Sequence, residues 1–214
     1  MKQLLSWFTL IMLSTGSLFA QSDAQSQKIL KGVSARYKGY TSLSASFTLN
    51  ILDQKSQKQE KQSGSILLKG DQFRLSMNDQ TIISDGKTTW TYLKESNEVQ
   101  ISENVNDENA ITPANIFTMY EKGFKSKFNG EKSVNGKTQQ IIELVPEDTK
   151  KSFFKVQLQI DKAGQYVSEA KVFDKSGNIY TYSIQKFTPN ATVTADQFTF
   201  NASTYPGIEI VDLR

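Results

Sequence analysis

Apolar residues recur with a helical period near the start of the chain. Between residues 23 and 38, Ile29, Val33 and Tyr37 follow one another at four-residue intervals. This spacing places one apolar stripe on a helix of about 3.6 residues per turn. Gly39 stands where the helix is expected to end, because glycine readily takes the conformation found just past a helix. The pattern predicts an amphipathic helix that packs against a core.

From residue 44 onward the period changes to two, which is typical of strands with one dry and one wet face. Asp85-Gly86 is the strongest hairpin signal in the chain. The predicted strands cover residues 44–51, 65–69, 72–77, 81–84, 88–93, 98–102, 131–134, 139–145, 154–160, 166–173 and 179–187. Residues 53–62 are polar and are expected to form a loop, or frayed strand ends around one, and Gly130 is expected to mark a turn. Short strands at nearly even spacing predict one meandering antiparallel sheet.

A second helix is predicted in the middle of the chain. Thr112 can cap it, Pro113 takes the first helical position, and Ile111 and Ile116 occupy the two positions of a hydrophobic staple. Gly123 is expected to end it. A long sheet with one apolar face must curl around something or pack on a second layer, so both helices are expected on its concave side.

The first twenty residues have the proportions of a secretory signal peptide. Lys2 gives a basic start, residues 4–19 are mostly apolar, and Ala20 is a small residue suited to cleavage. We expect residues 1–20 to be removed and residues 21–214 to form a single domain. An uncleaved anchor is the alternative. No cysteine follows the apolar run, so we expect an exported soluble protein without a lipid-modified cysteine.

The composition narrows the possible chemistry. The chain has no His and no Cys, which excludes Ser-His-Asp and Cys-His catalysis, imidazole zinc sites and disulfides. The net charge of +3 is spread among interspersed acids and bases and predicts no nucleic-acid surface. Asp85, Glu95, Glu98, Asp107 and Glu108 lack the spacing of an acid–base pair or a calcium loop. We therefore expect no enzyme activity, no catalytic residues, no metal and no cofactor.

Several segments, in order along the chain, resemble the outer-membrane lipoprotein carrier protein LolA family. The clearest is Ser84–Tyr92, SDGKTTWTY, which is similar to that family's Ser-Asp-Gly-Lys-x-x-Trp-x-Tyr hairpin. The other matching segments are residues 44–48, 64–69, 73–74, 196–200 and 206–208, together with the helix that begins at Pro113. Each motif is short, and their common order over residues 21–214 carries the resemblance.

The resemblance implies a mainly β fold, an incomplete antiparallel β-barrel of about eleven strands whose concave face is covered by helices. It also implies a periplasmic chaperone that binds the acyl chains of lipoproteins in a lidded cavity and carries them from the inner to the outer membrane. The implied partners are acylated lipoproteins, an ATP-driven release complex in the inner membrane and an acceptor in the outer membrane. A monomer is expected.

Bulky apolar residues on the sheet and the lid are the candidate lipid-binding residues. They are Leu30, Val33, Phe47, Leu49, Phe73, Trp90, Tyr92, Ile116, Phe117, Met119, Tyr120, Phe154 and Leu158. Without the resemblance, such residues are more often a solid core than a cavity. Trp90 and Tyr92 share one face of their strand, and they line the cavity if that face is the concave one.

The predicted lid lacks the usual latch sequence of the family. The family commonly has Lys-Arg-Pro before its Phe-Arg element, whereas this chain has Lys69-Gly70-Asp71 before Phe73. Lys69 and Arg74 are therefore the candidates to hold the lid closed.

Two alternative functions stay open. One is a lipid-binding sensor or outer-membrane acceptor of the same fold, although the family's acceptor is lipid-anchored and this chain has no cysteine. The other is an extracytoplasmic carboxylate hydrolase or glycan-binding module. Exposed carboxylates facing a groove would favour the second alternative, and a closed apolar cavity would exclude it.

Overall fold

The computed structural model describes residues 17–103, 120 and 123–214, and side chains from residue 24 onward. Its first element is helix α1 (Ser17–Lys38), which ends where the periodicity predicts but begins earlier than residue 23. The amide of Gly39 donates to the carbonyls of Ala35 and Arg36, each at 3.2 Å, and closes the last turn. Cleavage after Ala20 stays a prediction and would shorten α1 at its N-terminal end.

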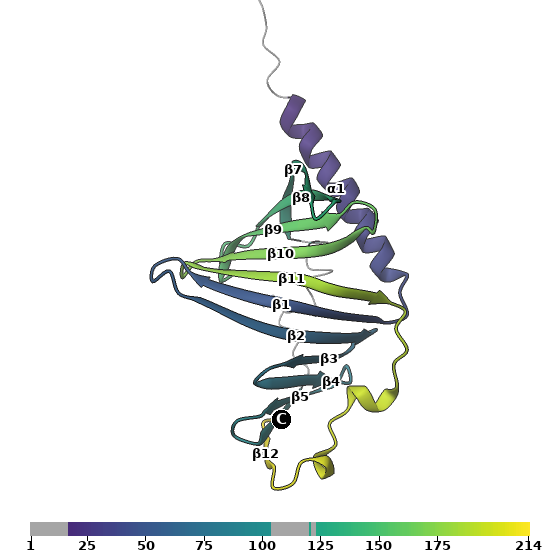
Figure 1. Cartoon of the computed structure of the whole chain (residues 1–214), viewed down its shortest axis with the longest axis vertical. Helices are drawn as coiled ribbons and strands as arrows, with labels where there is room; N and C mark the ends of the chain where they lie inside the picture. The colour runs from purple at the N-terminus through teal and green to yellow at the C-terminus, as the bar shows by residue number, and fades with distance from the viewer. Residues whose placement is uncertain (1–16, 104–119, 121–122) are drawn as a thin grey trace, which may run out of the picture.

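Twelve strands follow α1 and form one sheet (Figure 1). They are β1 (Leu43–Asp53), β2 (Gln59–Lys69), β3 (Gln72–Met77), β4 (Gln80–Ser84), β5 (Thr88–Leu93), β6 (Glu98–Glu103), β7 (Phe124–Val134), β8 (Lys137–Pro146), β9 (Phe153–Asp161), β10 (Tyr166–Asp174), β11 (Asn178–Pro189) and β12 (Glu209–Asp212). Two short 3₁₀ helices, η2 (Ala195–Phe198) and η3 (Ala202–Thr204), lie between β11 and β12. The predicted mainly β fold with a single large sheet is confirmed.

The strand order is β12-β6-β5-β4-β3-β2-β1-β11-β10-β9-β8-β7. Consecutive strands pair antiparallel from β1 to β6 and from β7 to β11, and β1 pairs with β11, so the two halves of the meander join in the middle of the sheet. The added strand β12 pairs parallel with β6. The sheet is open because β12 and β7 form its two edges, and Figure 1 shows it curling between them.

β1 ends at Asp53 and β2 begins at Gln59, so the predicted loop is confined to residues 54–58 and the flanking residues of the region 53–62 are strand ends. One detail of the strands differs from the prediction. Gly130 lies inside β7, where the register with β8 shifts between Phe128 and Glu131. It has φ +98°, which glycine adopts without strain, and therefore forms a β-bulge and not a turn.

The sheet has two faces, which the register assigns residue by residue because directly paired residues point to the same side. We call the face that carries Phe47 the inner face and the opposite one the outer face. Phe47 pairs with Gly64, and Gly64 pairs with Met77, so all three lie on the inner face. α1 packs against β7 and β10 (Figure 1), and its buried Leu30 and Val33 belong to the same core as the sheet.

The main core lies between α1 and strands β8–β10. It contains the fully buried Ile142, Leu144, Val156, Leu158 and Ile160. Tyr120 also lies in this core, and the rest of the predicted second helix lies outside the described residues.

Polar contacts join the N-terminal part of α1 to β7. The hydroxyls of Ser26 and Ser126 lie 2.8 Å apart in the interior, and Gln27 Nε2 donates to Ser126 Oγ at 3.0 Å. A buried hydroxyl must find a hydrogen-bond partner, so these contacts fix where the helix docks on the edge strand.

Candidate functional site on the inner face

The inner face carries an apolar surface on strands β1–β4 and β11. Phe47 and Leu49 are buried there, with Ala45, Ile66 and Leu75 beside them. Around this centre lie partly exposed apolar side chains, namely Ile51, Leu68, Phe73, Met77, Ile82, Tyr180, Tyr182, Ile184 and Phe187. We call these residues the inner apolar surface. Its strands lie in the half of the sheet beyond β10, whereas α1 packs on β7 and β10.

The centre of this surface depends on one close approach. A Cβ atom at Gly64 would lie 2.5 Å from Cζ of Phe47. The Phe47 ring therefore lies across β2 in the space that a side chain at position 64 would fill. Glycine in a strand often marks such an approach. Gly64 is a site residue that the sequence analysis assigned no role, and its place opposite Phe47 becomes apparent only with the register.

Two tyrosines border the same surface. Tyr182 lies opposite Leu49 and its ring centroid is 6.2 Å from that of Phe47. Burial raises the pKa of the Tyr182 phenol above its ordinary value, and the neighbouring Tyr180 raises it further. Burial has the same effect on the phenol pKa of Tyr37 in α1. These phenols stay neutral at ordinary pH, so this face presents no negative charge from them.

Most predicted lipid-binding residues lie on the inner side. Phe47, Leu49 and Phe73 belong to the inner apolar surface, and Leu30, Val33, Tyr120 and Leu158 lie in the main core under α1. Leu30, Val33, Tyr120 and Leu158 are each at most 5% exposed, so they pack as a core in this structure. Ile116, Phe117 and Met119 lie outside the described residues.

Trp90 and Tyr92 lie on the outer face, opposite to the face assumed for a cavity wall. Phe73 is on the inner face, so its neighbour Arg74 is on the outer face. Arg74 pairs with Ile83, and Ile83 pairs with Trp90. Ile83 and Trp90 therefore also lie on the outer face. The alternation correctly placed Trp90 and Tyr92 on one strand face, but that face is not the one that carries Phe47.

The C-terminal segment covers this part of the outer face. The ring centroid of Tyr92 is 4.5 Å from that of Tyr205 and 6.0 Å from that of Phe200. Arg74 Nη1 donates to the carbonyl of Gln197 at 3.0 Å. This hydrogen bond joins Arg74 to the C-terminal segment. Arg74, one of the two predicted latch residues, therefore lies on the face away from α1. The second latch candidate, Lys69, is exposed at the end of β2.

Phe154 is also placed differently from its prediction. The register between β9 and β10 shifts next to Phe153, which turns Phe153 into the core and Phe154 outward. Phe154 is 50% exposed and its ring lies 6.2 Å from that of Phe173, over which Lys155 Nζ sits at 4.3 Å. Simple alternation had grouped Phe154 with Leu158, and the bulge separates them.

The SDGK motif has a structural explanation. Asp85 Oδ1 accepts from the amides of Lys87 and Thr88, each at 2.8 Å, and Ser84 Oγ accepts from the Gly86 amide at 3.2 Å. Gly86 has φ +95°, which favours glycine. The hydrogen bond from Thr88, followed by that from Lys87, outweighs burial and lowers the pKa of the Asp85 carboxyl. These residues build the β4–β5 turn.

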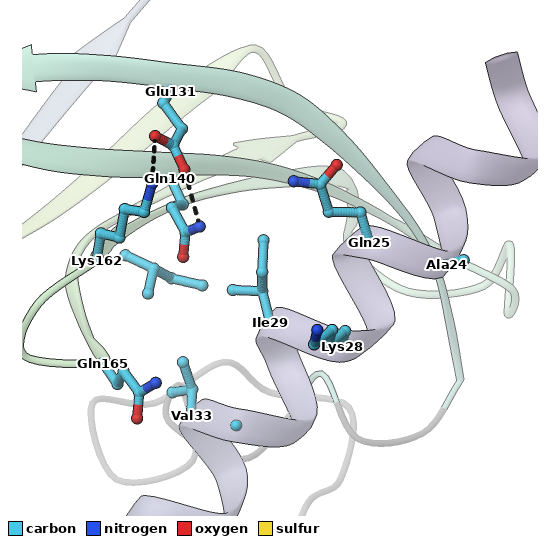
Figure 2. Close-up of a pocket in the computed structure, with 11 residues that line it drawn as sticks. Ala24, Gln25, Lys28, Ile29, Val33, Glu131, Gln140, Lys162 and Gln165 are labelled. Carbon is cyan, nitrogen blue, oxygen red and sulfur yellow. Dashed lines mark hydrogen bonds and ion pairs between the residues drawn. The ribbon is translucent and has the colours of Figure 1, made fainter.

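A pocket of about 690 Å³ opens between α1 and the sheet (Figure 2). Its lining residues are Ala24, Gln25, Lys28, Ile29, Gly32, Val33, Glu131, Gln140, Ile160, Lys162 and Gln165. Lys162 Nζ lies 2.9 Å from Glu131 Oε2, and Gln140 Nε2 donates to Glu131 Oε1 at 3.1 Å. The hydrogen bonds from Lys162 and then Gln140 lower the pKa of the Glu131 carboxyl.

Sequence reasoning missed this pocket. Its sheet side combines Glu131, Gln140, Lys162 and Gln165, which are far apart until the hairpins align them. The helix side does leave a signal, because Gln25, Lys28, Ile29 and Gly32 fall on one face at helical spacing.

Among the described residues, no group of His, Cys, Asp and Glu is arranged to hold a metal ion.

Within the same residues, no helix combines the length and the hydropathy needed to cross a membrane.

An open, curled sheet with an apolar inner face and helix α1 packed on that face defines a half-barrel fold. Residues 38–201 match the protein family described as "Outer membrane lipoprotein carrier protein LolA", and the chain belongs to this family.

Individual relatives add no activity that could be transferred to this chain. An uncharacterized protein of Methanocaldococcus jannaschii is 27% identical over 201 residues, which make up 89% of this chain and 56% of that protein. The chain thus spans little more than half the length of this curated relative.

Two solved structures share the fold. An uncharacterized conserved protein from Thermus thermophilus superposes with a TM-score of 0.58 at 16% identity, covering 88% of this chain and 99% of the other. The Mycobacterium tuberculosis lipoprotein LppX superposes with a TM-score of 0.51 at 13% identity, covering 82% of this chain and 100% of the other. At these identities the likeness establishes the fold.

Proposed function

We propose that the protein is a periplasmic chaperone that binds the acyl chains of lipoproteins and carries them from the inner to the outer membrane. The observation that carries this proposal is the inner apolar surface on β1–β4 and β11, on the face of an open sheet that also carries α1. Membership of the lipoprotein carrier family supports the same conclusion.

The chemistry of the surface suits an acyl ligand. Each methylene that leaves lipid for water costs about 0.8 kcal/mol, so an acyl anchor needs apolar cover to cross an aqueous compartment. Met77 and the aromatic side chains of Phe73 and Tyr182 provide such apolar cover. Methionine in particular adapts to ligands of different outline. The surface therefore fits a carrier that must bind several cargoes and release them.

The proposed role is binding and not catalysis. A chain without His and Cys offers acyl chemistry few nucleophiles or general bases. The proposed partners are acylated lipoproteins, an ATP-driven release complex at the inner membrane and an acceptor at the outer membrane.

Site-specific photo-crosslinking tests the proposal with a matched control in the same strand. Met77 lies on the inner face, and the adjacent Ser76 lies on the outer face. A photoreactive residue at position 77 should form a covalent adduct with a purified triacylated lipoprotein, and the same residue at position 76 should not. Equal labelling at both positions, or labelling by the same lipoprotein without its acyl chains, would overturn the proposal.

A further inference from the structure

The exposed side of α1 carries positive charge that no acidic residue of the helix balances. Among its described side chains, from residue 24 to residue 38, there is no aspartate or glutamate. The exposed cations of this stretch are Lys28, Lys31, Arg36 and Lys38. Exposed helices commonly alternate glutamate with lysine, because pairs three or four residues apart stabilise the helix. The described part of α1 lacks such pairs, so its charge pattern needs another explanation.

The helix dipole explains only part of this pattern. The C-terminal end of a helix carries a partial negative charge, which favours Arg36 and Lys38 in the last turn. The effect falls off within one turn, so it does not account for Lys28 and Lys31. At helical spacing, Lys28, Lys31 and Lys38 lie along one side of α1. They extend over about 15 Å, since each residue adds about 1.5 Å to a helix.

The neighbouring edge strand extends the positive surface. α1 packs against β7 (Figure 1), on which Lys125 and Lys132 are exposed. The acidic residue of β7, Glu131, forms an ion pair with Lys162 at 2.9 Å. We call the following cations of the two elements the basic edge: Lys28, Lys31, Arg36, Lys38, Lys125 and Lys132.

The opposite edge of the sheet is acidic. β6 begins at Glu98 and ends at Glu103. The outermost strand, β12, begins at Glu209 and ends at Asp212. Neither strand contains a lysine or an arginine. Acids and bases are interspersed along the sequence, but the fold separates them because β7 and β12 form the two edges of the sheet. A negatively charged surface should therefore attract one edge and repel the other.

The side chains between the cations of α1 favour a fluid partner over a shaped one. Protein interfaces have a buried centre in which a few aromatic or other bulky side chains dominate the binding. The exposed positions between the cations and just before them hold Ala24, Gln25, Gln27 and Ala35, and Gly32 is half-buried. These residues offer no bulky side chain to bury. A layer of anionic headgroups needs none, because it attracts each lysine or arginine near its surface.

We propose that the basic edge docks on the surface of a bilayer that contains anionic lipids. α1 lies along the bilayer with Lys28, Lys31 and Lys38 among the lipid phosphates, and the acidic edge at β12 points away from it. The docking side of α1 is opposite to the side that buries Leu30 and Val33 in the core. The docking goes beyond the proposed carrier function, because it concerns how the cargo-free protein meets a membrane.

Reversal of two charges tests the docking with a matched control. The double variant Lys28→Glu/Lys31→Glu changes the basic edge. The double variant Lys58→Glu/Lys61→Glu makes the same change in net charge, at the same spacing, on two exposed lysines of the β1–β2 hairpin. Circular dichroism checks that both variants fold.

Co-sedimentation of the cargo-free, exported protein with vesicles of phosphatidylglycerol and phosphatidylcholine measures the binding. Binding should be at least tenfold weaker in Lys28→Glu/Lys31→Glu than in the wild type, because each basic residue near an anionic surface contributes to the attraction. The control variant should stay within about twofold of the wild type, because its charges are remote from the bilayer and screened by salt.

Salt and lipid composition separate an electrostatic attachment from an apolar one. Raising the salt from about 0.1 M to 1 M shortens the Debye length from about 10 Å to 3 Å and should weaken the binding at least tenfold. Vesicles of phosphatidylcholine alone should bind neither the wild type nor the variants.

Equal binding to both kinds of vesicle would overturn the proposal, as would an equal loss in the two double variants. Absence of binding to the phosphatidylglycerol vesicles would also overturn it, and retention on immobilised polyglutamate would then assign the basic edge to an acidic protein. The carrier function is tested separately, because Lys28→Glu/Lys31→Glu should keep the lipoprotein crosslink at position 77 on β3. The two proposals can therefore fail independently.

Discussion

At the scale of single residues, Phe47 and Gly64 act as a pair in the inner apolar surface. Phe47 is 3% exposed, and its ring occupies the place of a side chain on the neighbouring strand. The ring is rigid and enclosed, so a new Cβ at position 64 cannot be accommodated without moving it. The pairing explains why a residue with poor strand propensity is found inside β2.

Gly64→Ala should therefore destabilise the protein by about 1–3 kcal/mol, the usual cost of overpacking a core. Chemical denaturation measures the change. Ser65→Ala, at the next and exposed position of β2, is the control and should change the free energy of unfolding by less than about 0.5 kcal/mol. A neutral or stabilising Gly64→Ala would mean that the Phe47 ring can move aside freely.

Asp85 stabilises the β4–β5 turn most strongly as a carboxylate. Its pKa in the folded protein is lowered, whereas the unfolded chain has an ordinary value of about 3.9. A lowered folded pKa gives stability that is present above the unfolded pKa and is lost as pH falls through the folded one. The SDGK motif therefore predicts a pH-dependent turn and not a functional site.

Asp85→Asn keeps an acceptor oxygen but cannot titrate. The difference in unfolding free energy between wild type and Asp85→Asn should favour the wild type at pH 7 and shrink as the pH is lowered from about 5 toward 3. Urea denaturation at several pH values measures this difference. A constant difference over that range would contradict the turn role of the carboxylate.

At the scale of elements, the apolar side of the sheet changes from one face to the other. On β1–β3 the buried apolar residues point inward, whereas on β5 and β6 Trp90, Tyr92 and the fully buried Val99 point outward. β4 carries both, with Ile82 inside and Ile83 outside. The outer apolar residues are covered by the C-terminal segment, in which Phe198 is fully buried and η2 contacts β3.

This change of face explains what the sequence could and could not predict. Period-two alternation identified the strands and showed which residues share a face within each one. It could not connect the faces of different strands, because that requires the register, and so it left open which side of the sheet carries Trp90. It also missed the bulges at Gly130 and Phe153, since an extra residue reverses the alternation locally.

Two phenylalanines test these assignments. Phe198→Ala should destabilise by about 3–5 kcal/mol, because it empties a fully buried site between the C-terminal segment and the outer face. Phe154→Ala removes the same side chain from a position that is 50% exposed and should cost clearly less, about 1 kcal/mol or below. Thermal unfolding of both variants gives the comparison, and equal losses would contradict the bulge next to Phe153.

At the scale of the whole molecule, the sheet separates two apolar regions that are covered by different parts of the chain. The outer region is filled by the chain's own C-terminal segment, through Phe198, Phe200 and Tyr205. The inner region is covered by α1 over β7 and β10 and carries the inner apolar surface in its other half. A ligand proposed for the inner side should therefore leave the outer side, and Trp90 with it, unchanged.

Fluorescence quenching by a lipoprotein with brominated acyl chains tests this central claim directly, because bromine quenches only a nearby indole. The emission of Trp90 on the outer face should not be quenched when the cargo binds. In a variant that combines Trp90→Phe with Met77→Trp, the new indole on the inner apolar surface should be strongly quenched. Quenching of Trp90 with none at position 77 would place the acyl chains on the outer face and contradict the account.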